Sequence, residues 1–325
     1  MIFVLFSFLK ASFGNEIIYS EKDIFYHFEN RIHFEGKKEF SSFVFFSRSG
    51  ILYPLDTIYI SIDKAIASLN YKNFEVSFGR DNLFWGYGMF YSPFWYGSSS
   101  ISPFDEELLK EGKNIFSLQY NNIPNITPEF IIFLPGDPPK IDSIKGGMHF
   151  SFFSSGLEAH FPIVFSKKAF YPGAGIRFSI LGFIIFSDFS FEFSSKETFA
   201  STTGFNKIFG DNFCFHFEFF YNQKGLTKEE YDATPKEDLP KLLEPGGSGR
   251  KYIYSVIRWT DEINGIGLFS LVNPEWKSGI LGIFLTSYFF ENSLISLNYV
   301  RILKGREFDF IPYKNIFSIE LRYYI

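Results

Sequence analysis

The feature of this chain that most restricts its fold is an alternation of apolar and polar residues with a period of two. In the segment from Phe213 to Tyr221, every second residue is aromatic, and His216 and Glu218 stand between the rings. Successive side chains of a β-strand point to opposite faces of a sheet, so this period is that of a strand with one apolar and one polar face. The pattern recurs along the chain and predicts an all-β protein.

Composition and strand length decide between a soluble β-sandwich and a membrane barrel. The chain has 325 residues, with 47 Phe, 19 Tyr and 4 Trp, yet 21% of its residues are charged. A sandwich would have to bury all these rings in one thin core, whereas a lipid-facing surface needs no such core. The alternating segments are about 9–12 residues long, the length that crosses a bilayer at a tilt. We therefore expect a single antiparallel transmembrane β-barrel.

The number of strands is expected to be about sixteen, within a range of about 14–18, because single-chain barrels of this kind have an even number. Successive connections of an antiparallel barrel lie at alternate ends. The strands read from the pattern do not put the short links near 122–125 and 261–265 at one end and the long polar segment 222–250 at the other. These placements agree if one further strand lies within 195–210 and another in the N-terminal half. The strands read directly from the pattern are 24–35, 39–48, 57–70, 73–82, 113–122, 127–135, 145–155, 157–167, 172–181, 183–194, 211–222, 251–260, 263–272, 279–289, 293–303 and 314–325.

The first fourteen residues are typical of a secretory signal peptide. Ile2–Leu9 is an apolar run of the right length, and Ser12-Phe13-Gly14 is a small-x-small cleavage site. No Lys or Arg precedes the apolar run, and the alternative is that this segment forms a first buried strand. We predict a signal peptide over residues 1–14 and a barrel over residues 15–325.

Several classes of function find no support in the sequence. The net charge of −5 argues against a nucleic-acid partner, since phosphate binding needs a basic surface. Cys214 is the one cysteine, and the five histidines show no metal-ligand spacing. Neither a G-x-S-x-G nor an H-E-x-x-H motif is present. We expect no metal, no cofactor and no enzymatic activity.

One enzymatic alternative stays open. Some membrane barrels are lipases or proteases, whose catalytic groups lie at a rim and show no spacing in the sequence. Glu158 with His160, and His216 with Glu218, each share one strand face at a separation of two residues. Such a pair can act as an oriented base.

The last strand carries a more specific pattern. Phe317, Ile319, Leu321, Tyr323 and Ile325 share one face, opposite Ser318, Glu320, Arg322 and Tyr324. This resembles the C-terminal signature strand of bacterial outer-membrane barrels, although that signature normally ends in Phe or Trp. The resemblance implies location in the outer membrane of a Gram-negative-type bacterium. It also implies recognition of residues 314–325 by the barrel-assembly machinery.

A second resemblance lies in the irregular stretch that follows the strand at Phe74. Gly79-Arg80-Asp81 and Trp85-Gly86-Tyr87-Gly88 resemble a G-R-Q-x-x-x-W-G-x-G motif of outer-membrane barrels. These barrels include porin-like families and the capsule-assembly and alginate-export group. Asp81 departs from the usual Gln. The resemblance implies a barrel that conducts solutes, or one that exports or anchors a polysaccharide.

The same stretch has a physical interpretation. Strict alternation would point Arg80 toward lipid, which costs about 2–4 kcal/mol at the bilayer midplane. A β-bulge at Gly79 would turn Arg80 into the lumen. We expect the Gly-, Pro- and aromatic-rich segment 83–109 to fold into the barrel as a constriction, the alternative being an ordinary extracellular loop. Residues 222–250 are expected to form a mobile extracellular loop.

Together these patterns predict an outer-membrane channel for small hydrophilic solutes or ions. The alternatives are a polysaccharide exporter or surface anchor, in which aromatic rings would stack on sugars, and a barrel enzyme. The expected partners are outer-membrane lipids and a small hydrophilic solute or saccharide. The residues expected in the constriction and lumen are Arg80, Asp81, Trp85, Phe90, Trp95, Glu158, His160, Arg177, Asp188, Glu192, His216, Glu218, Arg258, Glu320 and Arg322.

Overall fold

The computed structural model describes eleven segments of the chain. They are residues 6–20, 24–38, 41–53, 57–81, 85–89, 91–94, 113–134, 144–234, 249–290, 292–303 and 314–324. These segments contain 18 strands and one short helix, α1(Lys228–Ala233), and no helix among them is long and apolar enough to span a membrane. The all-β prediction is confirmed, with a strand count at the upper end of the expected range.

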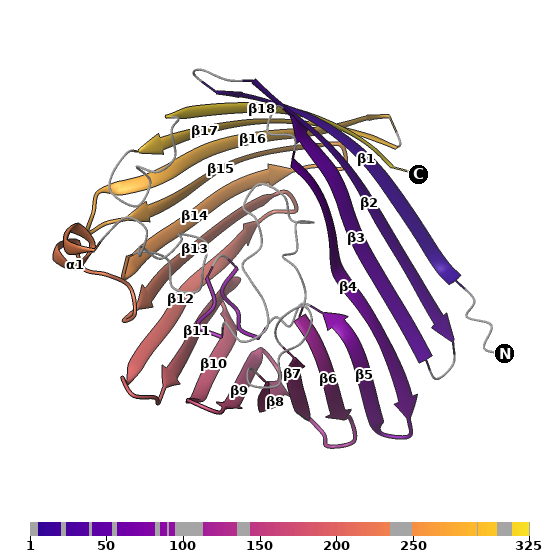
Figure 1. Ribbon diagram of the computed structural model, residues 1–325, viewed down its shortest axis with the longest axis vertical. Helices are drawn as coiled ribbons and strands as arrows, with labels where there is room; N and C mark the ends of the chain where they lie inside the picture. Colours follow the sequence, from indigo (N-terminus) through magenta and orange to yellow (C-terminus); the bar gives the residue numbers. More distant parts are fainter. Residues whose placement is uncertain are drawn as a thin grey trace.

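The strands follow one another around a single sheet (Figure 1). They are β1(Phe6–Ser20), β2(Ile24–Lys38), β3(Ser41–Tyr53), β4(Thr57–Tyr71), β5(Phe74–Asp81), β6(Lys113–Tyr120), β7(Ile126–Leu134), β8(Lys145–Ser154), β9(Leu157–Ser166), β10(Phe170–Ile180), β11(Phe183–Glu192), β12(Thr198–Phe209), β13(Phe213–Asn222), β14(Lys251–Thr260), β15(Asn264–Asn273), β16(Ser278–Phe290), β17(Ser293–Leu303) and β18(Asn315–Tyr324).

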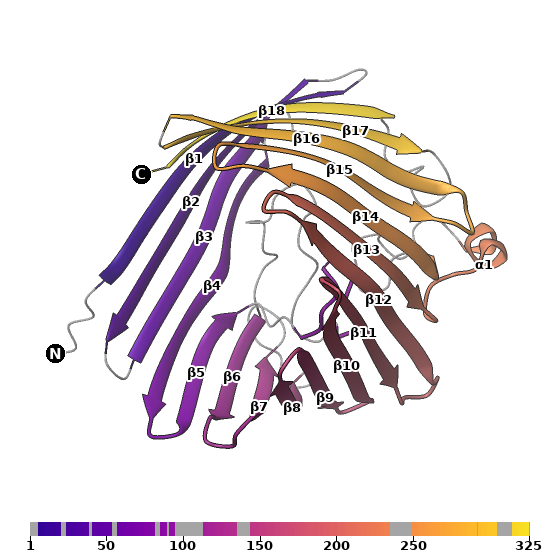
Figure 2. The same cartoon turned by 180° about the vertical axis from the view of Figure 1, so that it is seen from behind.

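The sheet closes on itself into a barrel. Each strand pairs antiparallel with its neighbours in sequence, and β1 also pairs with β18, from Ser12↔Tyr324 to Ser20↔Ile316. Figures 1 and 2 show β1 lying beside both β2 and β18. Pairing with β18 covers Ser12–Ser20 of β1, and pairing with β5 covers Ala65–Tyr71 of β4, so the backbone groups of these stretches find their partners within the ring.

Two strands were not read directly from the alternation. β12 lies within 195–210, where the parity of the connections required a strand, and β1 supplies the additional strand in the N-terminal half. β1 includes Phe6–Gly14, the segment predicted to belong to a signal peptide. Removal of residues 1–14 stays a prediction.

The two ends of the barrel differ in the length of their connections. At one end the strands are joined by tight turns, such as Leu181-Gly182, where φ is 51° and 73°. Positive φ at both central residues is typical of a two-residue hairpin turn. We call this the short-turn end. The opposite, long-loop end carries the connections 82–112, 135–144, 223–250 and 304–314.

The two faces of the sheet have opposite character, as the alternation predicts. Large apolar side chains are exposed on the outside, as Ile60, Phe78 and Phe161 show. The inner face carries polar side chains, among them the buried Asp188 and Thr202. The buried apolar clusters of the described residues include Trp85, Tyr91 and Phe94, which belong to the connection between β5 and β6. Apolar packing inside the barrel is therefore concentrated where this connection meets the wall.

Candidate functional site

Part of the β5–β6 connection lies inside the barrel against its inner wall. This inner segment, Trp85–Met89 and Tyr91–Phe94, is the short purple trace beside β10, β11 and β12 in Figure 1. An inward-folded loop is expected from the sequence over 83–109, and the described part of that connection contacts the inner wall. Phe90 and Trp95, two of the predicted constriction residues, lie outside the described residues.

The wall beneath the inner segment is a lateral row of side chains from consecutive strands. Each residue of the row is the direct pairing partner of the next, from β9 to β14. We call this the docking row: His160, Gly175, Asp188, Thr202, Phe220 and Tyr252. It presents a polar half and an aromatic half to the segment.

Asp188 is the main polar anchor of the docking row. Its Oδ2 accepts hydrogen bonds from the backbone N–H of Tyr87 at 2.6 Å and of Gly88 at 3.1 Å. Its Oδ1 lies 3.0 Å from His160 Nε2, and the aspartate side chain is fully buried. Hydrogen bonds to an ionised carboxylate are shorter and stronger than neutral ones. One buried side chain thus binds two backbone groups of the segment.

Gly175 allows His160 and Asp188 to meet, because it lies between them on β10. A Cβ atom at this position would lie 1.9 Å from His160 Nε2 and 2.2 Å from Asp188 Oδ1. Any other residue at position 175 would therefore push these two side chains apart. The glycine is required by this close approach, not by its backbone angles.

Glu218 forms a second anchor on β13. Its Oε1 accepts a hydrogen bond from Met89 N–H, and its Oε2 accepts one from Tyr91 N–H at 3.2 Å. His216 Nε2 lies 2.7 Å from the same carboxylate. Buried backbone N–H groups need partners. Asp188 and Glu218 together satisfy those of Tyr87, Gly88, Met89 and Tyr91.

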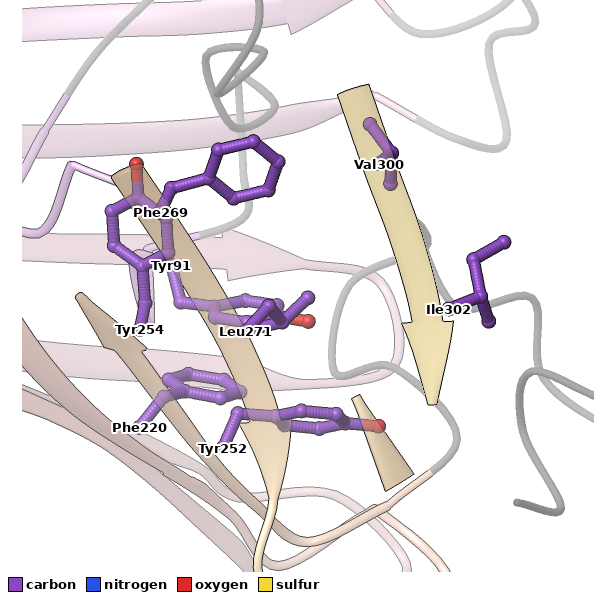
Figure 3. Close-up of a cluster of buried hydrophobic side chains, with 8 residues drawn as sticks. All are labelled: Tyr91, Phe220, Tyr252, Tyr254, Phe269, Leu271, Val300 and Ile302. Carbon is purple, nitrogen blue, oxygen red and sulfur yellow. The ribbon is translucent and has the colours of Figure 1, made fainter. Parts of the chain in front are cut away.

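The aromatic half of the docking row holds Tyr91. Its ring stacks on Phe220, with centroids 4.4 Å apart and planes at 10°, and it also contacts Tyr252 at 5.3 Å. Figure 3 shows these rings within a buried cluster on β13–β15 and β17. Thr202 Oγ1 donates a hydrogen bond to the Tyr91 carbonyl at 2.9 Å. Tyr91 is therefore fixed through its ring, its N–H and its carbonyl.

The two ends of the inner segment pack on β7–β9. Trp85 stacks on His149 at 4.8 Å, and the Phe94 ring meets the edge of His160 at 5.0 Å. Ser92 joins the two ends, because its Oγ donates to the Trp85 carbonyl at 2.9 Å and accepts from Phe94 N–H. The segment is a compact turn tied to itself as well as to the wall.

The absence of a side chain at Gly88 allows this compact turn to form. A Cβ atom at position 88 would lie 2.0 Å from the Tyr91 carbonyl oxygen. The backbone at Gly86 has φ +116°, a conformation that side chains rarely allow. The W-G-x-G pattern is thus explained by local geometry.

Charged side chains lie beside the Tyr87 ring. Arg177 Nη2 lies 2.6 Å from both carboxylate oxygens of Glu158, and the Arg177 guanidinium is 4.9 Å from the centre of the Tyr87 ring. Both charged side chains are partly exposed. They form a charged patch next to the inner segment.

The structure brings seven of the predicted site residues together at the inner segment. These are Trp85, Glu158, His160, Arg177, Asp188, His216 and Glu218. Other predicted residues form separate contacts on the inner wall. Glu320 pairs with Arg322 on β18, and Asp81 lies 2.9 Å from Lys64 Nζ. Arg258 has inner-face parity on β14, opposite Gly267.

Glu192 lies away from the docking row, toward the long-loop end. It forms an ion pair with Lys224. Both residues line a hollow of about 190 Å³ that also includes Lys145, Tyr171 and Pro93 of the inner segment. The hollow adds a mixed-charge surface beside the segment.

The predicted bulge at Gly79 is wrong. Pairing is continuous through this residue on both sides, with Ile66↔Gly79 and Gly79↔Ile115. The irregularity lies instead between β3 and β4, after Phe46. Gly79 adopts φ +140° and approaches the neighbouring strand, where a Cβ atom would lie 2.1 Å from the Ala65 carbonyl oxygen. By strand alternation, Arg80 therefore lies on the same face of β5 as Phe78.

Several residues of the docking row were not predicted from the sequence. Gly175, Thr202, Phe220 and Tyr252 take part because the lateral register of the sheet places them beside Asp188. Within the described residues, no group of three or more His, Cys, Asp or Glu is arranged to hold a metal ion. The site is thus a docking arrangement of hydrogen bonds and rings.

Comparison with known proteins assigns the fold. No protein-family model and no curated protein matches the chain. Among solved structures, Pseudomonas aeruginosa OccK3 (OpdO) is similar with a TM-score of 0.63 and 11% identity, over 98% of this chain and 95% of that one. OccD3 (OpdP) of the same organism gives 0.61 and 10%, over 98% and 90%.

A porin is also among the similar structures. The triple-mutant porin of Rhodopseudomonas blastica gives a TM-score of 0.56 and 9% identity, over 98% of this chain and 99% of that one. Likeness of this kind over nearly the whole length of both chains shows that the protein has a porin-like β-barrel fold.

Proposed function

We propose that this protein is an outer-membrane channel that lets small hydrophilic solutes or ions pass, with the inner segment narrowing its lumen. The observation that carries the proposal is the anchoring of four backbone N–H groups of that segment by Asp188 and Glu218 on the inner wall. A segment of a long connection that is held in this way is typical of a functional element.

The size and lining of the barrel support passage of water and solutes. Single-chain barrels of 16–18 strands enclose an aqueous channel in known architectures, and this chain has 18 strands. Its inner face carries charged pairs such as Glu158–Arg177 and Glu320–Arg322, while the outside is apolar. A polar lining inside an apolar belt suits a membrane barrel of a Gram-negative-type bacterium.

The histidine–carboxylate pairs favour a structural role over catalysis. A general base needs lone pairs that are available to a substrate. In the structure His160 contacts Asp188, whereas Glu158 pairs with Arg177, and His216 contacts Glu218. The Asp188 and Glu218 carboxylates each also accept two backbone N–H groups. His160, Asp188, His216 and Glu218 are all buried. We therefore infer that the pairs hold the inner segment and that the protein is not an enzyme.

The rings of the inner segment do not favour stacking on a sugar. Trp85, Tyr91 and Phe94 are only 5%, 4% and 2% exposed, because they pack against the wall. A saccharide chain could contact the polar edges of Tyr87 and Arg177, but the faces of these three buried rings would not be accessible to it. This favours a diffusion channel over a polysaccharide pathway built on those rings.

Assembly in the outer membrane is part of the proposal. β18 closes the ring by pairing with both β17 and β1. A strand that completes closure is well placed to carry the signal that the barrel-assembly machinery reads. We infer this role for residues 314–325.

The test is single-channel conductance of the refolded chain in a planar bilayer, with and without a neutral oligosaccharide. Discrete open steps are expected, and the oligosaccharide should not block them at millimolar concentration. A folded barrel that shows no conductance steps would overturn the proposal of a channel. Block by the oligosaccharide would overturn the preference for small solutes and support a saccharide pathway.

A further inference from the structure

A row of neighbouring aromatic rings, stacked or tilted against one another, crosses the outer face of β9–β13 at the long-loop end. Successive centroid distances along it are 5.1, 6.0, 6.4, 5.1 and 6.1 Å. We call this row the aromatic rail, and it consists of Phe165, Phe170, Phe193, Phe191, Phe199 and Tyr221. Interfacial rings are common on membrane barrels, but this set is continuous over five strands.

The backbone fixes the rings of the rail side by side. Phe165 pairs directly with Phe170, and Phe191 pairs directly with Phe199. Phe170 and Phe193 exchange two backbone hydrogen bonds, at 3.0 and 2.8 Å. Phe165, Phe191 and Phe193 are 46%, 45% and 44% exposed, so the rail presents a broad apolar surface outward.

The two turns that join strands of the rail carry lysines between its rings. Phe165-Ser-Lys-Lys-Ala-Phe170 contains Lys167 and Lys168, and the turn from Phe193 to Phe199 contains Lys196. All three lysines are exposed. Each ammonium group is thus within a few residues of a rail ring on either side in sequence.

Serines at the start of each turn fix its shape. Ser166 Oγ donates to the Ala169 carbonyl at 3.1 Å and accepts from Ala169 N–H at 3.0 Å. Ser194 Oγ donates to the Lys196 carbonyl at 3.0 Å. These local bonds hold the lysine-bearing turns directly beyond the ends of the strands, adjacent to the apolar rail.

The charge of these turns contrasts with that of the opposite end. The two turns carry three lysines against one acidic residue, Glu197. Glu230 of α1 also lies within electrostatic range of Lys196, but it faces Arg250 at 3.1 Å as well. At the short-turn end, the described turn residues include Asp211, Asp261 and Glu262 against one lysine, Lys72.

We propose that the aromatic rail and Lys167, Lys168 and Lys196 form a docking surface for a phosphorylated lipid of the leaflet at the long-loop end. The acyl chains lie against the rings, and the phosphate groups contact the ammonium groups of the two turns. Aromatic rings prefer the boundary between acyl chains and head groups, and lysines near an anionic leaflet attract its phosphates. The proposal rests on membrane insertion but not on solute passage.

The experiment is a titration of the detergent-solubilised full-length chain with diphosphoryl lipid A, with bound lipid counted by native mass spectrometry. Dephosphorylated lipid A and inorganic phosphate are titrated in parallel. The variant is Lys167→Gln with Lys168→Gln and Lys196→Gln. The matched control is Lys72→Gln with Lys277→Gln and Lys314→Gln, which makes the same charge change away from the rail.

The wild type is expected to bind diphosphoryl lipid A about tenfold or more tightly than the dephosphorylated lipid. The rail variant should lose that difference, and the control should keep it. Equal binding of both lipids by the wild type would overturn the proposal, as would equal loss in both variants. Inorganic phosphate that displaces the lipid at equal concentration would indicate an ion site instead of a lipid surface.

Failure of this proposal is distinguishable from failure of the channel. Conductance of the rail variant is expected to match the wild type, since its lysines belong to turns beyond the strand ends and not to the inner segment. A conducting barrel without lipid selectivity would contradict only the docking surface. A silent barrel with lipid selectivity would contradict only the channel.

Discussion

His160 and Asp188 meet across an intervening strand, with His160 Nε2 3.0 Å from Asp188 Oδ1 above Gly175 of β10. The histidine leaves the second carboxylate oxygen of Asp188 to Tyr87 and Gly88. Orientation of one buried carboxylate thus determines where the inner segment lies. The anchors of that segment can be tested one at a time.

Substitution Gly175→Ala should destabilise the barrel by about 1–3 kcal/mol, because the new methyl group overlaps His160 and Asp188. The measurement is thermal unfolding in detergent, followed by the mobility shift of the folded barrel on a gel. Gly146→Ala is the control, since a Cβ atom there meets nothing within 4 Å. Equal midpoints for both variants would contradict the close contact at position 175.

Substitution Thr202→Val should cost about 0.5–1.5 kcal/mol, the net value of one hydrogen bond, because the Tyr91 carbonyl loses its donor without a change in side-chain shape. Thr203→Val is a neighbouring control on the outer face, where the hydroxyl contacts Ser187. In limited proteolysis of the folded barrel, the inner segment should be cleaved faster in Thr202→Val than in the wild type or in Thr203→Val. Cutting at the same rate in both would show that Thr202 does not hold Tyr91.

Substitution Phe220→Ala should destabilise the barrel by about 3–5 kcal/mol, because a buried ring stacked on Tyr91 is removed. The adjacent Phe219 faces outward and is 37% exposed. Phe219→Ala should therefore cost much less. Denaturant unfolding of both variants gives the comparison, and a larger loss for Phe219→Ala would reverse the assignment of the two faces.

The chain isolated from an outer-membrane fraction should begin at Asn15 if residues 1–14 are a signal peptide. Backbone pairing from Asn15↔Leu321 to Ser20↔Ile316 remains after such cleavage, so β1 and β18 can still close the ring. Intact mass and N-terminal sequencing measure the processed end. Recovery of residues 6–14 in the folded barrel would instead show that the whole of β1 is retained in the mature protein.

The stability of the N-terminal cap of α1, formed by Thr227 and Glu230, should depend on pH. The backbone N–H of Thr227 donates to Glu230 and holds the pKa of that carboxyl below its ordinary value of 4.5, and Arg250 acts in the same direction. Because the folded pKa is depressed, the stabilisation is present above pH 4.5 and is lost as the pH falls through the folded pKa. Hydrogen exchange at Tyr231 N–H, which bonds Thr227, should accelerate at low pH.

Glu230→Gln is the control for this prediction. A glutamine keeps the cap hydrogen bond but does not titrate. Exchange at Tyr231 should then show no acid-dependent acceleration beyond that of intrinsic chemistry. Retention of the acceleration in Glu230→Gln would assign it to another group.

Period-two alternation is sufficient to predict the strands and their two faces wherever the outer face is rich in Phe. The order of residues alone places His160, Asp188, His216 and Glu218 on the inner face. Alternation does not show β12 directly, because Ser201 and Thr203 occupy outer positions there and weaken the contrast. The parity of the connections, not the residues, indicates that strand.

The docking row could not be predicted, because lateral register is a property of the assembled sheet. Nothing local to Gly175 shows that it lies between His160 and Asp188, which are 28 residues apart. The expectation about Gly79 failed for a related reason. A glycine before a charged residue suggested a bulge, but its role is a close approach to the Ala65 carbonyl.

The most direct test of the account is single-channel conductance of the double variant Asp188→Asn with Glu218→Gln. Both substitutions preserve size but remove the negative charge that binds the four backbone N–H groups. Glu158→Gln, a partly exposed carboxylate beside Arg177, is the matched control. We expect a larger and noisier open conductance in the double variant than in the wild type and the control. Equal conductance in all three folded barrels would contradict the claim that the anchored inner segment narrows the channel.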